Sequence, residues 1–97
     1  MKTIYISGAV TGDDNYRSKF ERAEKFLESR GFKVVNPVKD EVDGKAWSYY
    51  LRKDLRKLLD CDCIYVLSDW ATSRGALLEI NVALSLEMEI IHEGEIK

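Results

Sequence analysis

The feature that most constrains the fold is the regular alternation of short strand-like runs with longer amphipathic segments along the chain. The run CIYVLS at residues 63–68 is almost continuously apolar, which is typical of a parallel strand buried on both faces. The segments between the short runs carry apolar residues at the 3.6-residue spacing of helices. Strands are predicted at residues 2–7, 32–37, 63–68 and 88–93, and helices within residues 10–31 and at 46–60 and 73–87.

This order of strands and helices predicts an α/β fold. Parallel strands joined through helices use right-handed crossovers, which place helices on both faces of the sheet. We expect a three-layer α/β/α architecture with a four-stranded parallel sheet in the order 2-1-3-4, as in flavodoxin-like and Rossmann-like proteins. With 97 residues, a single domain over residues 1–97 is the simplest expectation. Ligands of such sheets bind at the carboxyl ends of the strands, here Ser7–Gly12, Asn36–Pro37 and Ser68–Gly75.

Composition and charge argue against several classes of partner. The formal net charge is −2 with both signs mixed along the chain, so neither nucleic acid nor a membrane surface is an expected partner. No apolar run approaches the roughly 20 residues of a membrane span, and MKTIYISG is too short and strand-like for a signal peptide. Cys61 and Cys63 with His92 are a weak candidate for a metal site; two reduced cysteines at a buried strand are favoured. A cytoplasmic protein is expected.

Two carboxylates lie on the apolar sides of two different predicted helices. At about 100° per residue, Glu79 falls in the sector of Val82 and away from Asn81. Asp54 falls about 20° from Trp47, at the edge of the apolar stripe of its own helix. A single acid in such a position is more often part of a buried salt bridge, or a residue at the edge of the helix face, than a catalytic group. Unpaired burial raises a carboxyl pKa, and two carboxyls with separated pKa values suit chemistry on a glycosidic bond.

Two loops have features of a nucleotide site. TSRG precedes the third predicted helix and places the Ser73 hydroxyl and free N–H groups where a phosphate would bind, with Arg74 adding positive charge. A Ser or Thr that only caps the helix is the alternative. YISGAVTG leaves the first strand through Gly8 and Gly12 but matches neither GxGxxG nor GxxxxGK[ST], which argues against dinucleotide binding and ATP hydrolysis. Tyr5, taken alone, is most simply a core residue.

Together these segments resemble a known superfamily. IYISGAVTG, then RKDL and LLDCDCIYVLSDW, then SRGALLE with its helix, resemble the nucleoside 2-deoxyribosyltransferases. Among the characterised branches, the chain resembles the 2′-deoxynucleoside 5′-phosphate N-hydrolases, and it also resembles small uncharacterised phage and bacterial members. The resemblance extends from Ile4 to about Ile91. In the family an Asp on the second helix precedes the nucleophilic Glu by a similar interval, and here Asp54 and Glu79 are 25 residues apart.

The resemblance implies roles for single residues. Glu79 matches the nucleophile that attacks the anomeric carbon of deoxyribose, and Asp54 matches the acid that assists protonation of the leaving base. Tyr5 matches the tyrosine that orients the catalytic carboxylate. Ser73 and Gly75 match the Ser-x-Gly that holds the 5′-phosphate, and no metal or organic cofactor is implied. The residues expected to bind substrate are Ser7, Gly8, Gly12, Asn36, Ser73, Arg74 and Gly75. Aromatic residues that could stack on a base or pack in the core are Trp47, Tyr49, Tyr50 and Trp70.

Three kinds of function stay open at this point. The favoured one is an enzyme that cleaves the N-glycosidic bond of deoxynucleosides or their 5′-monophosphates by hydrolysis or base transfer, through a glycosyl ester on Glu79. The second is a non-catalytic module that binds a nucleotide or nucleotide derivative as a sensor or sponge. The third is a structural or interaction protein of phage type, in which the inward acids are relics; failure to bind any nucleotide, with both acids salt-bridged, would favour it. A homo-oligomer, most simply a dimer, is expected from the small size and from the family's habit of building sites across subunits. Asp69 is either a second site acid or a plain loop residue.

Overall fold

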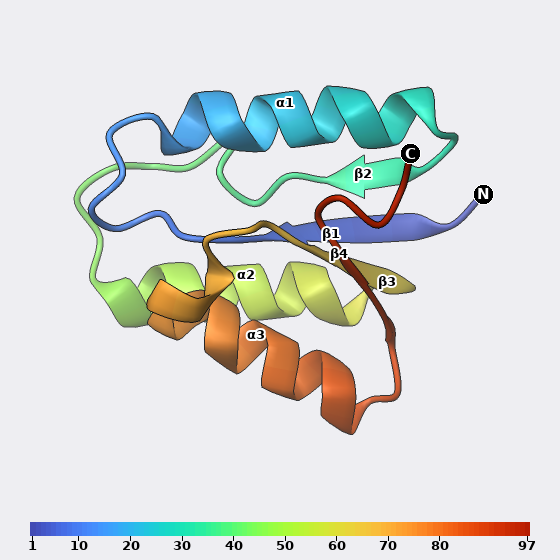
Figure 1. The fold of residues 1–97 in the computed structure, drawn as a ribbon. Helices are drawn as coiled ribbons and strands as arrows, with labels where there is room; N and C mark the ends of the chain where they lie inside the picture. Colours follow the sequence, from blue (N-terminus) through green and yellow to red (C-terminus); the bar gives the residue numbers. More distant parts are fainter.

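The computed structural model, which describes residues 1–97, contains one sheet of four parallel strands and three α-helices (Figure 1). The strands are β1 (Thr3–Ser7), β2 (Lys33–Val35), β3 (Cys63–Val66) and β4 (Glu89–His92). The helices are α1 (Tyr16–Ser29), α2 (Trp47–Leu59), α3 (Arg74–Ser85) and the 3-10 turn η1 (Trp70–Thr72). The order across the sheet is β2-β1-β3-β4, so the predicted fold class and strand order are confirmed.

Each face of the sheet has its own core. Figure 1 shows α1 on one face and α2 with α3 on the other. Successive strand residues point to opposite faces, so Ile4 and Ile6 pack toward α1 while Tyr5 points toward α2 and α3. The core on the α1 side comprises Ile4, Ile6, Phe20, Ala23, Leu27, Val38, Cys63, Tyr65 and Leu67. The core on the other side comprises Tyr5, Leu58, Ile64, Val66 and Ala83.

The two central strands end side by side. Ser7 of β1 pairs with Val66 of β3 at their carboxyl ends, and α3 begins eight residues further on at Arg74. The loops that follow β1 and β2 emerge at the same edge of the sheet (Figure 1). A functional site at this edge is therefore assembled from both central strands and from the first turns of α2 and α3.

Two details of the helices differ from the sequence prediction. Trp47 was expected in the inward stripe of α2, but it is 46% exposed, because its ring borders an open cavity and contacts Arg74. The 3-10 turn η1 was not anticipated, since three residues are too few to show a period. None of the helices is both long enough and apolar enough to cross a membrane.

Candidate active site

A cavity of about 460 Å³ lies at the carboxyl end of β1 and beside the first turns of α2 and α3, within the size range of small-molecule sites. It is lined by all three residues predicted to be catalytic, and by four of the residues predicted to bind substrate. These lining residues are Tyr5, Asp54, Glu79, Gly8, Ser73, Arg74 and Gly75. The fold therefore brings together residues that are separated by up to 74 positions in the sequence.

Glu79 is buried and is held by two hydroxyl groups. Its side chain comes from α3, whose buried residues Ala76, Glu79 and Ala83 form one stripe, so the predicted inward orientation is confirmed. The Tyr5 hydroxyl donates to Oε2 at 2.5 Å, and the Ser7 hydroxyl donates to Oε1 at 2.7 Å. No Lys, Arg or His forms an ion pair with this carboxylate. A buried salt bridge therefore does not explain why Glu79 is inside.

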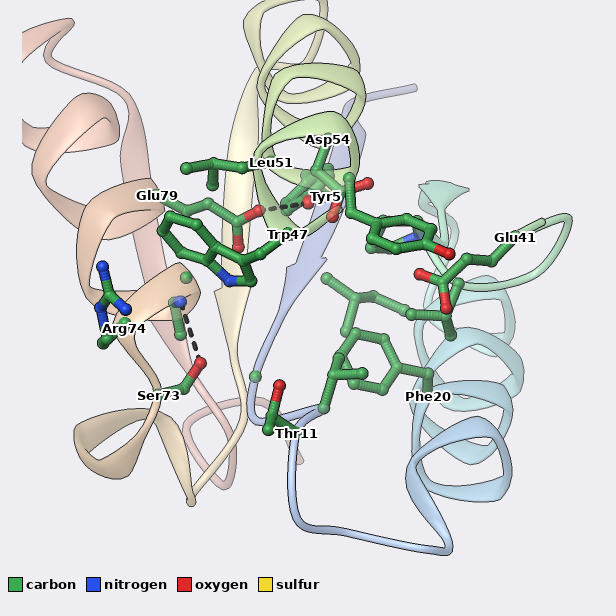
Figure 2. Close-up of a pocket in the computed structure, with 18 of the residues that line it drawn as sticks. Tyr5, Thr11, Phe20, Glu41, Trp47, Leu51, Asp54, Ser73, Arg74 and Glu79 are labelled. Atoms are coloured by element: carbon green, nitrogen blue, oxygen red, sulfur yellow. Dashed lines mark hydrogen bonds between the residues drawn. The ribbon is translucent and has the colours of Figure 1, made fainter. Parts of the chain in front are cut away.

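Asp54 points from α2 into the same cavity (Figure 2). It forms neither a hydrogen bond nor a salt bridge with any other side chain of the protein. Burial raises the pKa of Asp54 to about 7, against an opposing effect of the Lys57 ammonium group. A carboxyl group with this pKa and no protein partner is available to exchange a proton with a ligand at neutral pH.

The two carboxyl groups differ in their hydrogen-bond partners. Burial also raises the pKa of Glu79 to about 7, although the hydrogen bonds from Tyr5 and Ser7 partly oppose the shift. When the pair holds one proton, those two donors favour the charged form at Glu79, whereas Asp54 receives none. Burial and the Glu79 charge raise the pKa of Tyr5 well above its usual range, so Tyr5 stays a hydrogen-bond donor. The cavity thus holds two carboxyl groups whose pKa values are raised to about 7, of which only Glu79 is held by hydrogen bonds within the protein.

The stability of the protein should depend on pH through Glu79. Its pKa rises on folding from 4.5 to about 7, so folding favours its protonated form. The stability that the protonated Glu79 side chain contributes is therefore fully present below pH 4.5 and is lost as the pH rises through 7. We expect the free energy of unfolding of the wild type to fall by about 3 kcal/mol relative to Glu79→Gln between pH 4.5 and 8. Urea unfolding at both pH values measures this, and parallel pH profiles would contradict it.

The first turn of α3 has free donors at the cavity wall. Ser73 is the N-cap residue: its Oγ accepts a hydrogen bond from the Ala76 N–H at 3.1 Å, which leaves the hydroxyl hydrogen free. The N–H groups of Arg74 and Gly75 belong to the first turn and have no partner within the helix. The Arg74 guanidinium stacks on the Trp47 ring at 4.5 Å. The capping alternative is thus correct for Ser73, and it is compatible with binding an anion.

Three residues predicted to bind substrate do not line the cavity. Ser7 is 1% exposed beneath Glu79, so its hydroxyl supports that carboxylate instead. Gly12 lies in an exposed turn with φ of +84°. Asn36 faces the α1 side, where its amide donates to Glu24 at 3.2 Å and its Oδ1 accepts from the Val38 N–H. The side chains of Ser7 and Asn36 are therefore used within the protein, and Gly12 serves the turn.

Packing contacts show which roles are open to Gly8 and to the candidate aromatic residues. A Cβ on Gly8 would lie 2.7 Å from the Leu67 side chain, so close packing of two strand ends requires glycine there. Trp47 and Tyr50 line the cavity, whereas Tyr49 is exposed outside it. The remaining candidate, Trp70, packs edge-on against His92 with ring centroids 5.9 Å apart.

Asp69 belongs to the loop network rather than to the cavity. Its Oδ1 accepts a hydrogen bond from the Ala9 N–H at 3.0 Å, and its Oδ2 contacts the Lys19 ammonium group. Lys19 also donates to the Ala9 carbonyl and to Asp13. These contacts fix the loop after β1 against α1, so Asp69 positions the loop that borders the cavity.

Several cavity residues were not singled out by the sequence analysis, and Phe20 and Glu41 are two of them. Phe20 belongs to the apolar stripe of α1, and that pattern predicts core packing without indicating that one edge of the ring meets a cavity. Glu41 lies in the polar connection between β2 and α2, where no periodicity marks a residue that turns inward. Only the path of the loop in space places it at the site.

The sequence matches the family described as Domain of unknown function (DUF4406) over residues 2–92. No curated protein matches the chain. A 2-deoxyribosyltransferase from Leishmania mexicana is similar in structure, with a TM-score of 0.72 and 18% identity over 95% of this chain. A CMP N-glycosidase from Clostridium botulinum has a TM-score of 0.67 and 21% identity over 94%. A 2-deoxyribosyltransferase from Bacillus psychrosaccharolyticus has a TM-score of 0.71 and 18% identity over 98%.

The chain spans 63% of the length of the Leishmania protein, 70% of the Clostridium protein and 76% of the Bacillus protein. At these identities the likeness establishes a common fold. The resemblance seen in the sequence is confirmed at that level, with β1, β3 and α3 carrying the motifs that suggested it. The chain belongs to the DUF4406 family and has the fold of the nucleoside 2-deoxyribosyltransferases.

Proposed function

We propose that this protein cleaves the N-glycosidic bond of a deoxynucleoside or, preferentially, of its 5′-monophosphate. The observation that carries the proposal is the pair Glu79 and Asp54: two carboxyl groups with raised pKa values, no ion-pair partners and one shared cavity. Solved structures of the same fold are named as deoxyribosyltransferases and as a CMP N-glycosidase, which supports the same bond as the target.

The proposed mechanism has two displacements. The ionised Glu79 attacks the anomeric carbon, the C–N bond breaks, and the departing base takes the proton of Asp54. The product of this step is a glycosyl ester on Glu79. Water, or a second base, then attacks the same carbon, Asp54 accepts its proton, and the ester bond to Glu79 breaks; water gives the free sugar, and a base gives a new nucleoside or nucleotide. Tyr5 and Ser7 hold the carboxylate in place for both steps.

Release of free base tests the proposal directly. The protein is incubated with each deoxynucleoside and each deoxynucleoside 5′-monophosphate, with and without an added acceptor base. Release without an acceptor indicates hydrolysis, and release that needs an acceptor indicates transfer. Binding of a nucleotide without release of its base would contradict catalysis and support the non-catalytic binding module.

The preference for monophosphates should depend on Arg74. Its guanidinium lines the cavity beside the free N–H groups of α3, where it can contact a 5′-phosphate. We expect Arg74→Ala to lower kcat/KM for a monophosphate by about tenfold or more, with little change for the matching nucleoside. Arg52→Ala, on the exposed side of α2, is the control. Equal losses for both substrates would argue against a phosphate contact.

The assembly of the protein is a separate prediction. A homo-oligomer, most simply a dimer, is consistent with several large apolar side chains exposed on α2 and α3. These are Leu59, Leu77, Leu78 and Leu84. Sedimentation at micromolar concentration tests it, and a monomer would contradict it.

A further inference from the structure

The side chains of the cavity follow the same order as the parts of a nucleotide. Figure 2 shows Ser73 and Arg74 at one end, Glu79 in the middle and Glu41 at the opposite end. With a phosphate at the first turn of α3 and the anomeric carbon at Glu79, the base extends toward Glu41. Phe20 lies at the same end and supplies an apolar surface for the base (Figure 2).

Two other polar side chains that line the cavity, Tyr50 and Lys45, already make contacts within the protein. The Tyr50 hydroxyl donates to the Val42 carbonyl and accepts a hydrogen bond from the Lys45 N–H at 3.1 Å. The Lys45 ammonium group lies over the Tyr49 ring, 5.7 Å from its centroid, and Tyr49 does not line the cavity. Neither side chain is therefore set to read the edge of a base.

Glu41 is the exception. Its side chain is only 12% exposed, and its Oε1 accepts a hydrogen bond from the Tyr16 hydroxyl at 3.3 Å. The Arg17 guanidinium lies 3.9 Å from the same oxygen. Oε2 has no hydrogen-bond partner within the protein and belongs to a residue that lines the cavity. One carboxylate oxygen is thus fixed by the protein, and the other is left to a ligand.

We propose that Glu41 selects nucleobases that present an amino group at this end of the cavity, namely cytosine with its 4-amino group or adenine with its 6-amino group, over uracil, thymine and hypoxanthine. The inference rests on the proposed function, because it takes the orientation of the nucleotide from it. A carboxylate accepts hydrogen bonds and cannot donate them, so an exocyclic amino group satisfies Oε2. The carbonyl oxygen of an oxo base at the same position would face the carboxylate as a second acceptor, so the base would have to shift to bring its ring N–H to Oε2.

Matched pairs of substrates isolate this contact. dCMP with dUMP, and dAMP with dIMP, each differ by an amino group in place of an oxo group. We expect kcat/KM for base release to favour the amino member of each pair by about 10- to 100-fold. Glu41→Gln, whose amide can donate as well as accept, should bring the ratio close to one. The control is Asp43→Asn on the same loop, which lies 3.6 Å from Arg17 with a 94% exposed side chain and should keep the wild-type ratio.

Binding measurements separate this inference from the proposed reaction. The same pairs are titrated calorimetrically into Glu79→Gln, and into Glu79→Gln combined with Glu41→Gln. If Glu79→Gln binds the amino members more tightly, and adding Glu41→Gln abolishes that difference, the selection is supported even if no base is released. Base release at equal rates within both pairs overturns the selection and leaves the glycosidase intact. Absence of binding by all four nucleotides overturns both.

Discussion

Replacement of Glu79 by Gln is expected to lower base release by about 10⁴-fold or more while leaving the fold unchanged. The amide is a poor nucleophile, so the glycosyl ester cannot form. The shape of the side chain is retained, and the hydroxyls of Tyr5 and Ser7 can each donate to an oxygen or accept from an N–H. Initial rates of base release, together with the far-UV circular dichroism spectrum, measure both parts.

The matched control for this change is Glu24→Gln. Glu24 is also buried, at 8% exposure, but it accepts from Asn36 and Lys39 on the α1 side and does not line the cavity. It should keep near wild-type rates. Mass spectrometry of the wild type quenched during turnover should show an adduct carrying the sugar, which Glu79→Gln lacks. A Glu79→Gln protein that retains a tenth of the activity would remove Glu79 from the mechanism.

Asp54→Asn should produce the second large effect, a loss of about 10²- to 10⁴-fold that changes with pH. In the wild type, kcat/KM is expected to peak near pH 7, because catalysis needs Glu79 ionised and Asp54 protonated and burial raises the pKa of each to about 7. Activity should fall at low pH as Glu79 takes up a proton and at high pH as Asp54 loses one. An asparagine cannot lose that proton, so the residual activity should have no alkaline limb.

The acidic limb should also move in this variant. The negative charge of Asp54 contributes to the raised pKa of Glu79, so its removal should shift the limb to lower pH. Profiles of kcat/KM from pH 5 to 9 for the wild type and Asp54→Asn measure both changes. Asp60→Asn, which removes an exposed carboxylate at the end of the same helix, is the control. An alkaline limb that survives in Asp54→Asn would assign the proton donor to another group.

Periodicity explains which parts of this protein are predictable from sequence. The parallel sheet and the inward position of Glu79 follow from patterns within one strand or one helix, where neighbours along the chain decide the direction of a side chain. The same rule places Tyr5 and Ser7, two residues apart on β1, on one face of the sheet. Their joint contact with Glu79 could therefore have been foreseen, whereas a role of Ser7 in binding substrate was inferred only from its position at the strand end.

Loop residues lie outside the reach of that rule. Glu41 enters the cavity and Asn36 turns away from it because of the path that residues 36–46 take between β2 and α2. Trp47 shows the same limit at the start of a helix: the period places it with the inward side chains, but it borders the cavity and stays 46% exposed. Neighbouring elements, rather than local sequence, decide these positions.

The two hydrogen bonds on Glu79 also affect how the site forms during folding. They join residues separated by 74 and 72 positions, so they require that the first strand and the last helix have met. A nascent or partly folded chain therefore holds this acid in water, with the acidity of an ordinary surface glutamate. Glu79 acquires its buried environment only in the folded protein. When refolding is monitored by base release, activity should return no earlier than the packing of α3 against the sheet.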